Sequence, residues 1–313
     1  MSLVEKALKK MASARVATAS AAAAPRNTEA ALDRSRSAAA AAVVPTASVR
    51  EPEPPQAAIA RTDRVITFNF PQLRAAGLLP EEDEQRRLTA EYRQIKRPLI
   101  AAARGRGVPA LHNGRVIMVA SALPGEGKTF TSLNLALTLA LEKETTVLLV
   151  DGDLAKAHIS RALGVKEEPG LTDLLLDETA ETASAIIPTS IAGVSMLPAG
   201  RGAATATELL ASSRMERLIS EMLSRDPTRI VVFDSPPVLL TTEARALASV
   251  AGQIVVVVRA QGTVHKAVRD ALQFLGEDKP IGLVLNQCRP NGGHTYYGYG
   301  EYGDSTDSRT GSP

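Results

Sequence analysis

The stretch Val116-Ile-Met-Val-Ala-Ser-Ala-Leu-Pro-Gly-Glu-Gly-Lys-Thr129 decides the fold of this 313-residue chain. An apolar run over 115–121, typical of a buried strand, passes into a glycine-rich turn, and a helical pattern follows over 131–141. The turn matches the phosphate-loop pattern G-x-x-x-x-G-K-[ST] at Gly127-Lys-Thr129, whereas Ala122 stands at the first glycine position. A strand before the turn and a helix after it predict a loop whose backbone N–H groups bind phosphate.

A phosphate loop of this kind assigns roles to its side chains. We expect Lys128 to reach the β- and γ-phosphates of a nucleotide and the Thr129 hydroxyl to ligate Mg²⁺. A glycine turn without any ligand is the alternative, and the strand–turn–helix context argues against it. The residues expected to contact the nucleotide are Pro124, Gly125, Glu126, Gly127, Lys128, Thr129 and Phe130.

Strand and helix patterns alternate through the rest of the chain, which favours an α/β fold with a doubly wound, mostly parallel sheet. Continuous apolar runs such as 147–150 and 254–258 are typical of strands buried on both faces. The predicted strands are 115–121, 146–151, 194–198, 229–234, 253–259 and 281–286. The predicted helices are 88–97, ending near Pro98, then 131–141, 206–223 and 264–275.

Three aspartates follow two of the buried strands. Asp151 and Asp153 come after one strand, and Asp234 ends another. Because the C-terminal ends of parallel strands lie at one edge of a sheet, these carboxylates can meet the phosphate loop there. A helix cap or turn is the usual role of a single aspartate. Three of them beside a phosphate loop favour a catalytic or metal-binding role, since Mg²⁺ near phosphates is held by carboxylates.

Composition excludes several classes of protein. Hydrophobic residues make up 44% and charged residues 22% of the chain, which excludes a wholly disordered or collagen-like protein. The net charge of +2 argues against a nucleic-acid-binding domain. The one cysteine, Cys288, permits neither an intramolecular disulfide nor a cysteine-rich metal site. Because no apolar run approaches the length of a membrane span, the sequence predicts a cytoplasmic protein.

The tyrosines are concentrated at one end of the chain. Aromatic residues make up only 3% of the sequence, and four of the five tyrosines are Tyr296, Tyr297, Tyr299 and Tyr302. Glycines lie on both sides of the cluster and within it, so the segment has the flexibility of a phosphate acceptor that enters another active site. A low-complexity Gly/Tyr tail without that role is the alternative.

The N-terminal part differs in composition from the rest. Residues 12–60 are rich in Ala and interrupted by Pro, which predicts a flexible tether. The segment 2–11 has apolar residues on one helical face and is either a docking helix or a frayed terminus. We therefore divide the chain into an N-terminal region at 1–80, a catalytic domain at 81–290 and a tyrosine-rich tail at 291–313.

The motifs together resemble those of the bacterial tyrosine kinase family, in particular the autokinases encoded with exosortase and exopolysaccharide loci. The resemblance runs from about residue 88 to 302 and rests on Pro124-Gly-Glu-Gly-Lys-Thr129, Leu149-Val-Asp-Gly-Asp-Leu154, Val232-Phe-Asp-Ser-Pro-Pro237 and the tyrosine cluster. It implies a P-loop NTPase fold of the MinD/ParA type, ATP and Mg²⁺ as cofactors, and autophosphorylation that regulates exopolysaccharide synthesis. It also implies a homo-oligomer and a membrane polysaccharide co-polymerase as activator, through which the chain would lie at the inner face of the cell membrane.

Two departures from the family pattern bear on these expectations. Ala155 and Ala157 stand where the family often has Arg and Pro, and the helix associated with ring assembly has Ala90 three residues before Arg93, with Glu91 shifted by one position. The first departure leaves open a scaffold that binds nucleotide without transferring phosphate. The second leaves ring assembly open.

The chemistry expected from this resemblance is in-line transfer of the ATP γ-phosphoryl group to a tail tyrosine. Thr129 and Asp234 would hold the metal, and Asp151 would either join them or accept the tyrosine proton, with Asp153 as the weaker candidate for the same two tasks. Asn286 would contact the adenine or cap the sheet edge. A switch ATPase of the partitioning and division-site type is the main alternative. Leu123 stands where those ATPases have a signature lysine, which favours the kinase.

Overall fold

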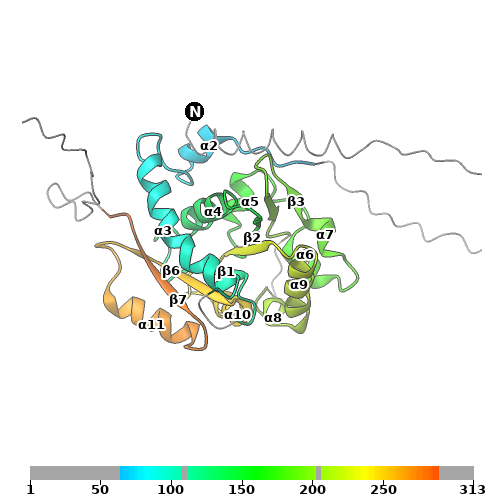
Figure 1. Cartoon of the computed structure of the whole chain (residues 1–313). Coiled ribbons are helices and arrows are strands. Elements are labelled where there is room, and N and C mark those ends of the chain that lie inside the picture. Colours follow the sequence, from blue (N-terminus) through cyan, green and yellow to red (C-terminus); the bar gives the residue numbers. More distant parts are fainter. Residues whose placement is uncertain (1–63, 107–110, 202–205, 289–313) are drawn as a thin grey trace, which may run out of the picture.

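A seven-stranded sheet with helices on both faces forms the centre of the molecule (Figure 1). The computed structural model describes residues 64–106, 111–201 and 206–288. The strand order is β3-β4-β2-β5-β1-β6-β7. The strands are β1 (Val116–Ser121), β2 (Thr146–Asp151), β3 (Ile187–Pro188), β4 (Val194–Leu197), β5 (Arg229–Asp234), β6 (Gln253–Arg259) and β7 (Ile281–Asn286).

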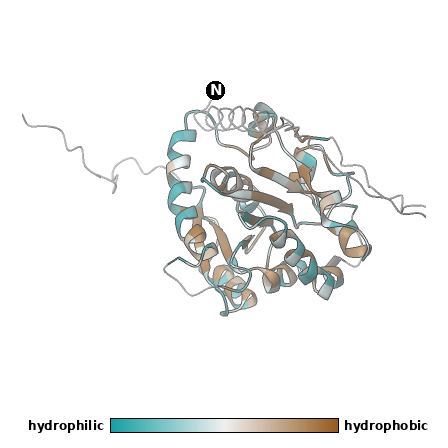
Figure 2. Cartoon of the chain, turned by 45° about the vertical axis from the view of Figure 1, so that its right-hand side comes forward, coloured by the Kyte–Doolittle hydropathy of each residue, from teal (hydrophilic) through white to brown (hydrophobic). Residues whose placement is uncertain are grey.

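The predicted parallel sheet is confirmed. Every strand pair is parallel except β3 with β4, a two-residue antiparallel pairing that the sequence did not predict. All six residues of β1 are buried, and the strands in the middle of the molecule are mostly apolar (Figure 2). Such strands read as continuous apolar runs because helices cover both of their faces.

The helices form two layers. On one face, α2 (Phe70–Ala75), α3 (Gln85–Ala103) and α4 (Lys128–Leu139) pack over the sheet, and α5 (His158–Ala162) contributes Ile159 to the same core. The helices α6 (Leu171–Leu176), α8 (Ala206–Leu210), α9 (Ser213–Ser224), α10 (Glu243–Val250) and α11 (His265–Leu275) cover the opposite face, and the short helix α7 (Thr182–Ala185) joins them.

Two helix predictions were wrong in their limits. The first predicted helix continues past Pro98 to Ala103, although proline removes one backbone hydrogen bond from a helix interior. The ring of Pro98 lies on the exposed side, while the neighbouring Leu99 is buried in the core and holds the last turns in place. The helix predicted over 206–223 is two helices, because Ser212 adopts an extended backbone and begins α9.

The folded body includes residues 64–80, which the sequence assigned to the N-terminal region. Ile66 forms a β-bridge with Thr189, and Leu73 of α2 is almost fully buried. The Asn69 side chain caps α2 by accepting a hydrogen bond from the Gln72 N–H at 3.2 Å. The predicted helix at 2–11, the tether and the tyrosine tail lie outside the described residues.

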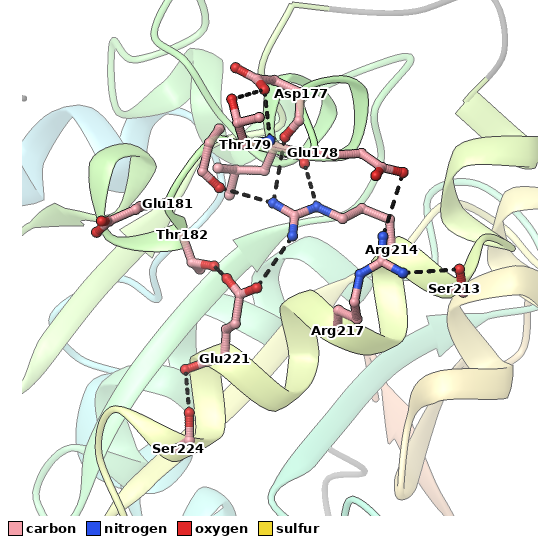
Figure 3. Close-up of polar contacts among 12 residues, drawn as sticks. Asp177, Glu178, Thr179, Glu181, Thr182, Ser213, Arg214, Arg217, Glu221 and Ser224 are labelled. Atoms are coloured by element: carbon pink, nitrogen blue, oxygen red, sulfur yellow. Dashed lines mark hydrogen bonds and ion pairs between the residues drawn. The ribbon is translucent and has the colours of Figure 1, made fainter. Parts of the chain in front are cut away.

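A buried arginine joins the helices at one end of the sheet (Figure 3). Arg214 of α9 donates hydrogen bonds to the carbonyls of Leu174 and Ala180 at 3.2 and 2.9 Å and pairs with Glu221 at 3.3 Å. The other Glu221 carboxylate oxygen accepts a hydrogen bond from Thr182. The guanidinium is used within the fold, so this cluster has a structural role.

Candidate functional site

The phosphate loop lies at the C-terminal edge of the sheet, between β1 and α4. Gly125 and Gly127 have positive φ angles of 78° and 95°, which L side chains rarely adopt. The α4 helix begins directly after Gly127, so its first N–H groups face the loop. The Lys128 side chain is buried, with its Nζ 4.0 Å from an Asp153 carboxylate oxygen.

Side chains from other parts of the chain hold the loop in shape. The buried Glu126 carboxylate accepts hydrogen bonds from the Leu123 N–H at 2.6 Å and from the Thr263 hydroxyl. The amides of Asn286 and Gln287 donate to the carbonyls of Glu126 and Gly125 at 2.9 and 3.0 Å. Asn286 therefore ties the loop to the end of β7, and its contact with adenine stays a prediction.

Asp151 and Asp234 lie side by side. They end β2 and β5, are direct partners in the parallel register, and are fully buried. One Asp151 oxygen accepts hydrogen bonds from the Ser160 N–H and hydroxyl at 2.9 and 2.7 Å. One Asp234 oxygen lies 3.1 Å from the Ser132 hydroxyl. The sequence predicted this convergence because parallel strands end at the same edge.

Burial shifts the proton affinity of this pair. Desolvation and the neighbouring Asp151 together raise the pKa of Asp234 to about 7, although Lys128 opposes the shift. Burial also raises the pKa of Asp151 to about 6, although the hydrogen bonds from Ser160 act to lower it. Two carboxyl groups in contact in a dry site do not both ionise readily without a cation.

Each of the three aspartates has one buried carboxylate oxygen without a hydrogen-bond partner among the described residues: Oδ1 of Asp151, Oδ2 of Asp153 and Oδ2 of Asp234. Buried polar atoms are normally paired, so these oxygens indicate a missing cation or donor. In the described part of the chain no group of three His, Cys, Asp or Glu side chains suffices to hold a metal. These residues fit Mg²⁺, which typically takes one or two carboxylates and completes its shell with phosphate oxygens and water.

Two cavities adjoin the phosphate loop. A cavity of about 500 Å³ lies beside Gly127 and Phe130, between the end of β7 and helix α3. Its α3 wall includes Arg87 and Glu91, which pair at 3.5 Å. The volume lies within the range of small-ligand sites.

The second cavity, of about 170 Å³, opens on the other side of the loop, next to Pro124 and Asp153. Its walls are largely apolar, with Leu154, Pro236, Pro237 and Leu240 among them, and Lys156, Thr241 and Glu243 add polar groups. The two cavities thus flank the loop from opposite sides, one beside Gly127 and one beside Pro124.

The sequence did not single out several residues that shape the site. Ser132 lies four positions after Lys128, so it shares a helical face with that lysine and reaches Asp234. The four-residue spacing from Lys128 could therefore have identified Ser132 from the sequence. Ser160 and Thr263 gave no such signal, because their contacts with Asp151 and Glu126 depend on how helix α5 and the segment after β6 pack against the site.

The departures from the family pattern lie at the rim of the site. Ala155 lines the smaller cavity and is exposed. Ala157 is buried and has a left-handed backbone with φ 46°, where glycine would be less strained. The acceptor tyrosines lie outside the described residues. The fifth tyrosine, Tyr92, is buried in α3, and this burial raises the pKa of its hydroxyl.

Comparison with known proteins places this architecture in a family. A family model described as "AAA domain" matches residues 114–277, just over half of the chain. The tyrosine-protein kinase YwqD of Bacillus subtilis is 31% identical over 185 residues, which cover 58% of this chain and 76% of YwqD. The chain belongs to the bacterial tyrosine kinase family. The matched region contains the phosphate loop and the three aspartates, whereas β7 and the tail follow the residues of the family model.

Other tyrosine kinases are similar to this family member. The tyrosine-protein kinase Wzc of Salmonella typhimurium is 34% identical over 197 residues, which are 62% of this chain and 27% of Wzc. The chain thus matches only about a quarter of the length of that relative. Among solved structures, the VpsO kinase domain is 28% identical with a TM-score of 0.54. The matched region covers 67% of this chain and 100% of the VpsO chain. The BceF tyrosine kinase domain is 30% identical with a TM-score of 0.52, and the match covers 62% of this chain and 76% of the BceF chain.

No helix in the described part of this tyrosine kinase family member is both long and apolar enough to cross a bilayer. Among the described residues the longest helix is α3, whose 19 residues include several charged side chains.

Proposed function

We propose that the chain is an ATP-dependent protein tyrosine kinase that phosphorylates tyrosines of its own C-terminal tail. The observation that carries this proposal is the set of three buried carboxylate oxygens without hydrogen-bond partners among the described residues, one of which lies 4.0 Å from the Lys128 Nζ at the phosphate loop. Together with family membership, this arrangement supports transfer of a phosphoryl group. In such reactions positioning and charge neutralisation supply most of the catalysis.

The nucleotide is proposed to lie across the loop with its phosphates on the α4 N-terminus. Lys128 and the loop N–H groups would bind the β- and γ-phosphates, and the 500 Å³ cavity would take the ribose and base, where Asn286 and Phe130 line its walls. Thr129, Asp234 and Asp151 would hold Mg²⁺. When bound, that ion neutralises charge that develops on the phosphates.

The acceptor tyrosine is proposed to enter the 170 Å³ cavity. Its apolar walls suit an aromatic ring, and the Asp153 oxygen that has no hydrogen-bond partner among the described residues, 4.0 Å from the Lys128 Nζ, suits the phenol hydroxyl as an acceptor. In the transfer, the phenol oxygen forms a bond to the γ-phosphorus, the bond from that phosphorus to the β,γ-bridging oxygen breaks, and ADP leaves. The phenol proton passes to Asp153. The position of Asp153 in the wall of this cavity supports that role more strongly than the sequence alone did.

The tail tyrosines are the proposed acceptors because the chain offers few others. Tyr92 is buried and packed within α3, so its hydroxyl is out of reach of an active site. The other four tyrosines are Tyr296, Tyr297, Tyr299 and Tyr302. From Asn286 to Tyr296 an extended chain spans up to about 35 Å, which allows transfer to the site of a second copy.

The proposal is tested by incubating the full chain with γ-labelled ATP and Mg²⁺ and mapping the labelled residues. We expect label on the tail tyrosines, none in Lys128→Met, and normal label in the surface control Lys143→Met. A variant with all four tail tyrosines changed to Phe should bind ATP and lose the label. ATP hydrolysis without tyrosine label would instead identify a switch ATPase, and nucleotide binding without either reaction would identify a scaffold.

The resemblance also supports a place in exopolysaccharide production. We include in the proposal a role in regulating exopolysaccharide synthesis, chain length or export, activation by a membrane polysaccharide co-polymerase, and assembly into a homo-oligomer at the inner face of the membrane. Adding the cytoplasmic segment of such a co-polymerase to the labelling reaction should increase the tyrosine label several-fold. An unchanged rate would remove this partner from the proposal.

A further inference from the structure

A third cavity lies at the opposite edge of the sheet from the phosphate loop. It measures about 200 Å³ and is bounded by residues just before β1, β2 and β5, which are adjacent strands, and by the end of α3. Because those strands are parallel, their N-terminal ends lie a full strand length from the catalytic edge. The cavity is therefore separate from the site described above.

Positive charge dominates the lining of this cavity. Arg104, Arg106 and Arg115 contribute guanidinium groups, and the single acidic residue in the lining is Glu144. Arg229, in the first position of β5, lies close by. Burial lowers its pKa, the neighbouring Asp226 opposes this shift, and the positive charges of Arg225 and Arg115 add to it. The Arg229 Nε is buried without a hydrogen-bond partner among the described residues.

Within the described ranges 64–106, 111–201 and 206–288, carboxylates offset little of this positive charge, apart from Asp226, which interacts electrostatically with Arg229. Arg104, Arg106, Arg115 and Arg229 take part in none of the ion pairs formed there. Asp226 lies in the same region, but its two oxygens accept hydrogen bonds from Thr146 and from Thr228 at 2.6 to 2.9 Å.

Some N–H groups of these arginines donate hydrogen bonds within the fold, and others do not. The Nη1 of Arg115 donates to four backbone carbonyls at 3.1 to 3.3 Å, which fixes the turn between α9 and β5. Its Nε and Nη2 make no hydrogen bond to a described residue. Arg104 uses only Nη2, toward the Lys143 carbonyl and the Thr145 hydroxyl, and Arg106 has no partner in the described part of the chain. Several N–H donors are thus free at one cavity.

We propose that this cavity binds a phosphate-type dianion, either a phosphotyrosine side chain or free inorganic phosphate. Planar guanidinium groups offer paired N–H donors that match the oxygens of a phosphoryl group, and several of them together recognise a doubly charged ligand. The ligand would also offset the repulsion between the clustered arginines. This site goes beyond the proposed function, because a kinase needs no second phosphate site for transfer.

The test uses the full chain with its four tail tyrosines changed to Phe, so that no phosphotyrosine of its own competes. Saturating Mg·ADP, with its binding measured separately, fills the phosphate loop. The probe is a fluorescent peptide of residues 291–304 with one phosphotyrosine, and its binding is followed by fluorescence anisotropy. Because the peptide is synthetic, the result does not depend on kinase activity.

We expect the phosphopeptide to bind and its unphosphorylated form not to bind, with inorganic phosphate displacing it at constant ionic strength. The double variant Arg104→Ala/Arg106→Ala should weaken binding by about tenfold or more, the loss expected for charged hydrogen bonds. Glu144→Gln should tighten it by about threefold, since it removes the one negative charge. Arg269→Ala, an exposed arginine on α11, is the matched control and should change nothing.

Thermal denaturation verifies that each variant is folded. Protection of the folded chain by inorganic phosphate, lost in the double variant and without any phosphopeptide binding, would support the site and assign it to the free ion. Equal phosphopeptide affinity in the double variant and the parent, or no response to either phosphate compound, would overturn the proposal.

Discussion

Asp151 and Asp234 are direct neighbours in the parallel register of β2 and β5, and both side chains are fully buried at the edge that holds the phosphate loop. This pairing places two carboxyl groups in a dry environment, where each raises the cost of ionising the other. Serine hydroxyls satisfy one oxygen of each group, and the second oxygen is left without a partner among the described residues. The buried pair therefore lowers the stability of the folded chain, and a bound cation would offset that cost.

Stability without metal and nucleotide should fall as pH rises. The pKa of Asp234 is raised to about 7 in the folded chain from a reference value of 3.8, so between about pH 4 and 7 the folded state holds a proton that the unfolded chain releases. The free energy of unfolding therefore decreases with pH across that window. We expect Asp234→Asn to unfold at a higher temperature than wild type at pH 8, with a gain of about 2 kcal/mol.

Calorimetry of EDTA-treated protein at pH 5, 6.5 and 8 checks this expectation. The comparison between wild type and variant isolates Asp234 from the other titrating groups, and the exposed Glu167→Gln serves as the control. The same stability slope with pH in Asp234→Asn and wild type would contradict the prediction.

Gly127→Ala should disable the phosphate loop. A Cβ at this position would lie 2.0 Å from the Asn286 Nδ2, and the φ of 95° is one that alanine rarely adopts. The added methyl would displace Asn286 and break its bond to the Glu126 carbonyl. We expect ADP affinity, measured by calorimetry, to fall more than tenfold.

Gly164→Ala is the matched control for the glycine substitution. Its φ is 69°, and nothing lies within 4 Å of the added Cβ. It should cost about 1 kcal/mol of stability from backbone strain and leave ADP affinity unchanged. Comparable loss of ADP binding in both variants would show that backbone strain alone, and not the contact with Asn286, is responsible.

Leu240→Asp should weaken use of the acceptor without affecting ATP. Leu240 is 64% exposed at the 170 Å³ cavity, so the substitution should leave the fold intact. A negative charge at the cavity would disfavour an aromatic ring and repel the acidic tail residues. Steady-state kinetics with a tail peptide should show a KM for the peptide raised about tenfold, or about 1.4 kcal/mol, with an unchanged KM for ATP.

Leu176→Asp is the control for this surface substitution, because Leu176 is 58% exposed on α6 and does not line the cavity. Its kinetics should match those of wild type. An unchanged peptide KM in Leu240→Asp would place the acceptor elsewhere.

Arg214→Ala should destabilise the fold. The change leaves the carbonyls of Leu174 and Ala180 and the Glu221 carboxylate without their donor (Figure 3). We expect a loss of about 3 kcal/mol in chemical denaturation, the scale for breaking a buried charged pair. Arg217→Ala, on the exposed side of the same helix, should stay within about 0.5 kcal/mol of wild type. Equal effects of the two substitutions would contradict the structural role of Arg214.

Local patterns predicted much of this architecture. The buried strands were found with nearly correct limits because their apolar runs, such as 147–150, are continuous. The phosphate loop was recognisable despite Ala122, since a strand and a helix enclose it. The two helix limits that failed depended on tertiary packing. Pro98 is tolerated because Leu99 anchors the helix to the core, and no local rule contains that information.

The sequence by itself determined the six longer strands, the phosphate loop and the fact that Asp151 and Asp234 would share one edge, because parallel connections and strand ends follow from periodicity and spacing. The tertiary structure decided which side chains complete the site. Ser160 of α5, Thr263 and Asn286 at the end of β7 reach their partners only when these elements pack together, and the residues that line the third cavity come from four separate segments. Such contacts depend on the relative placement of whole elements, which is fixed by the packing of the complete core.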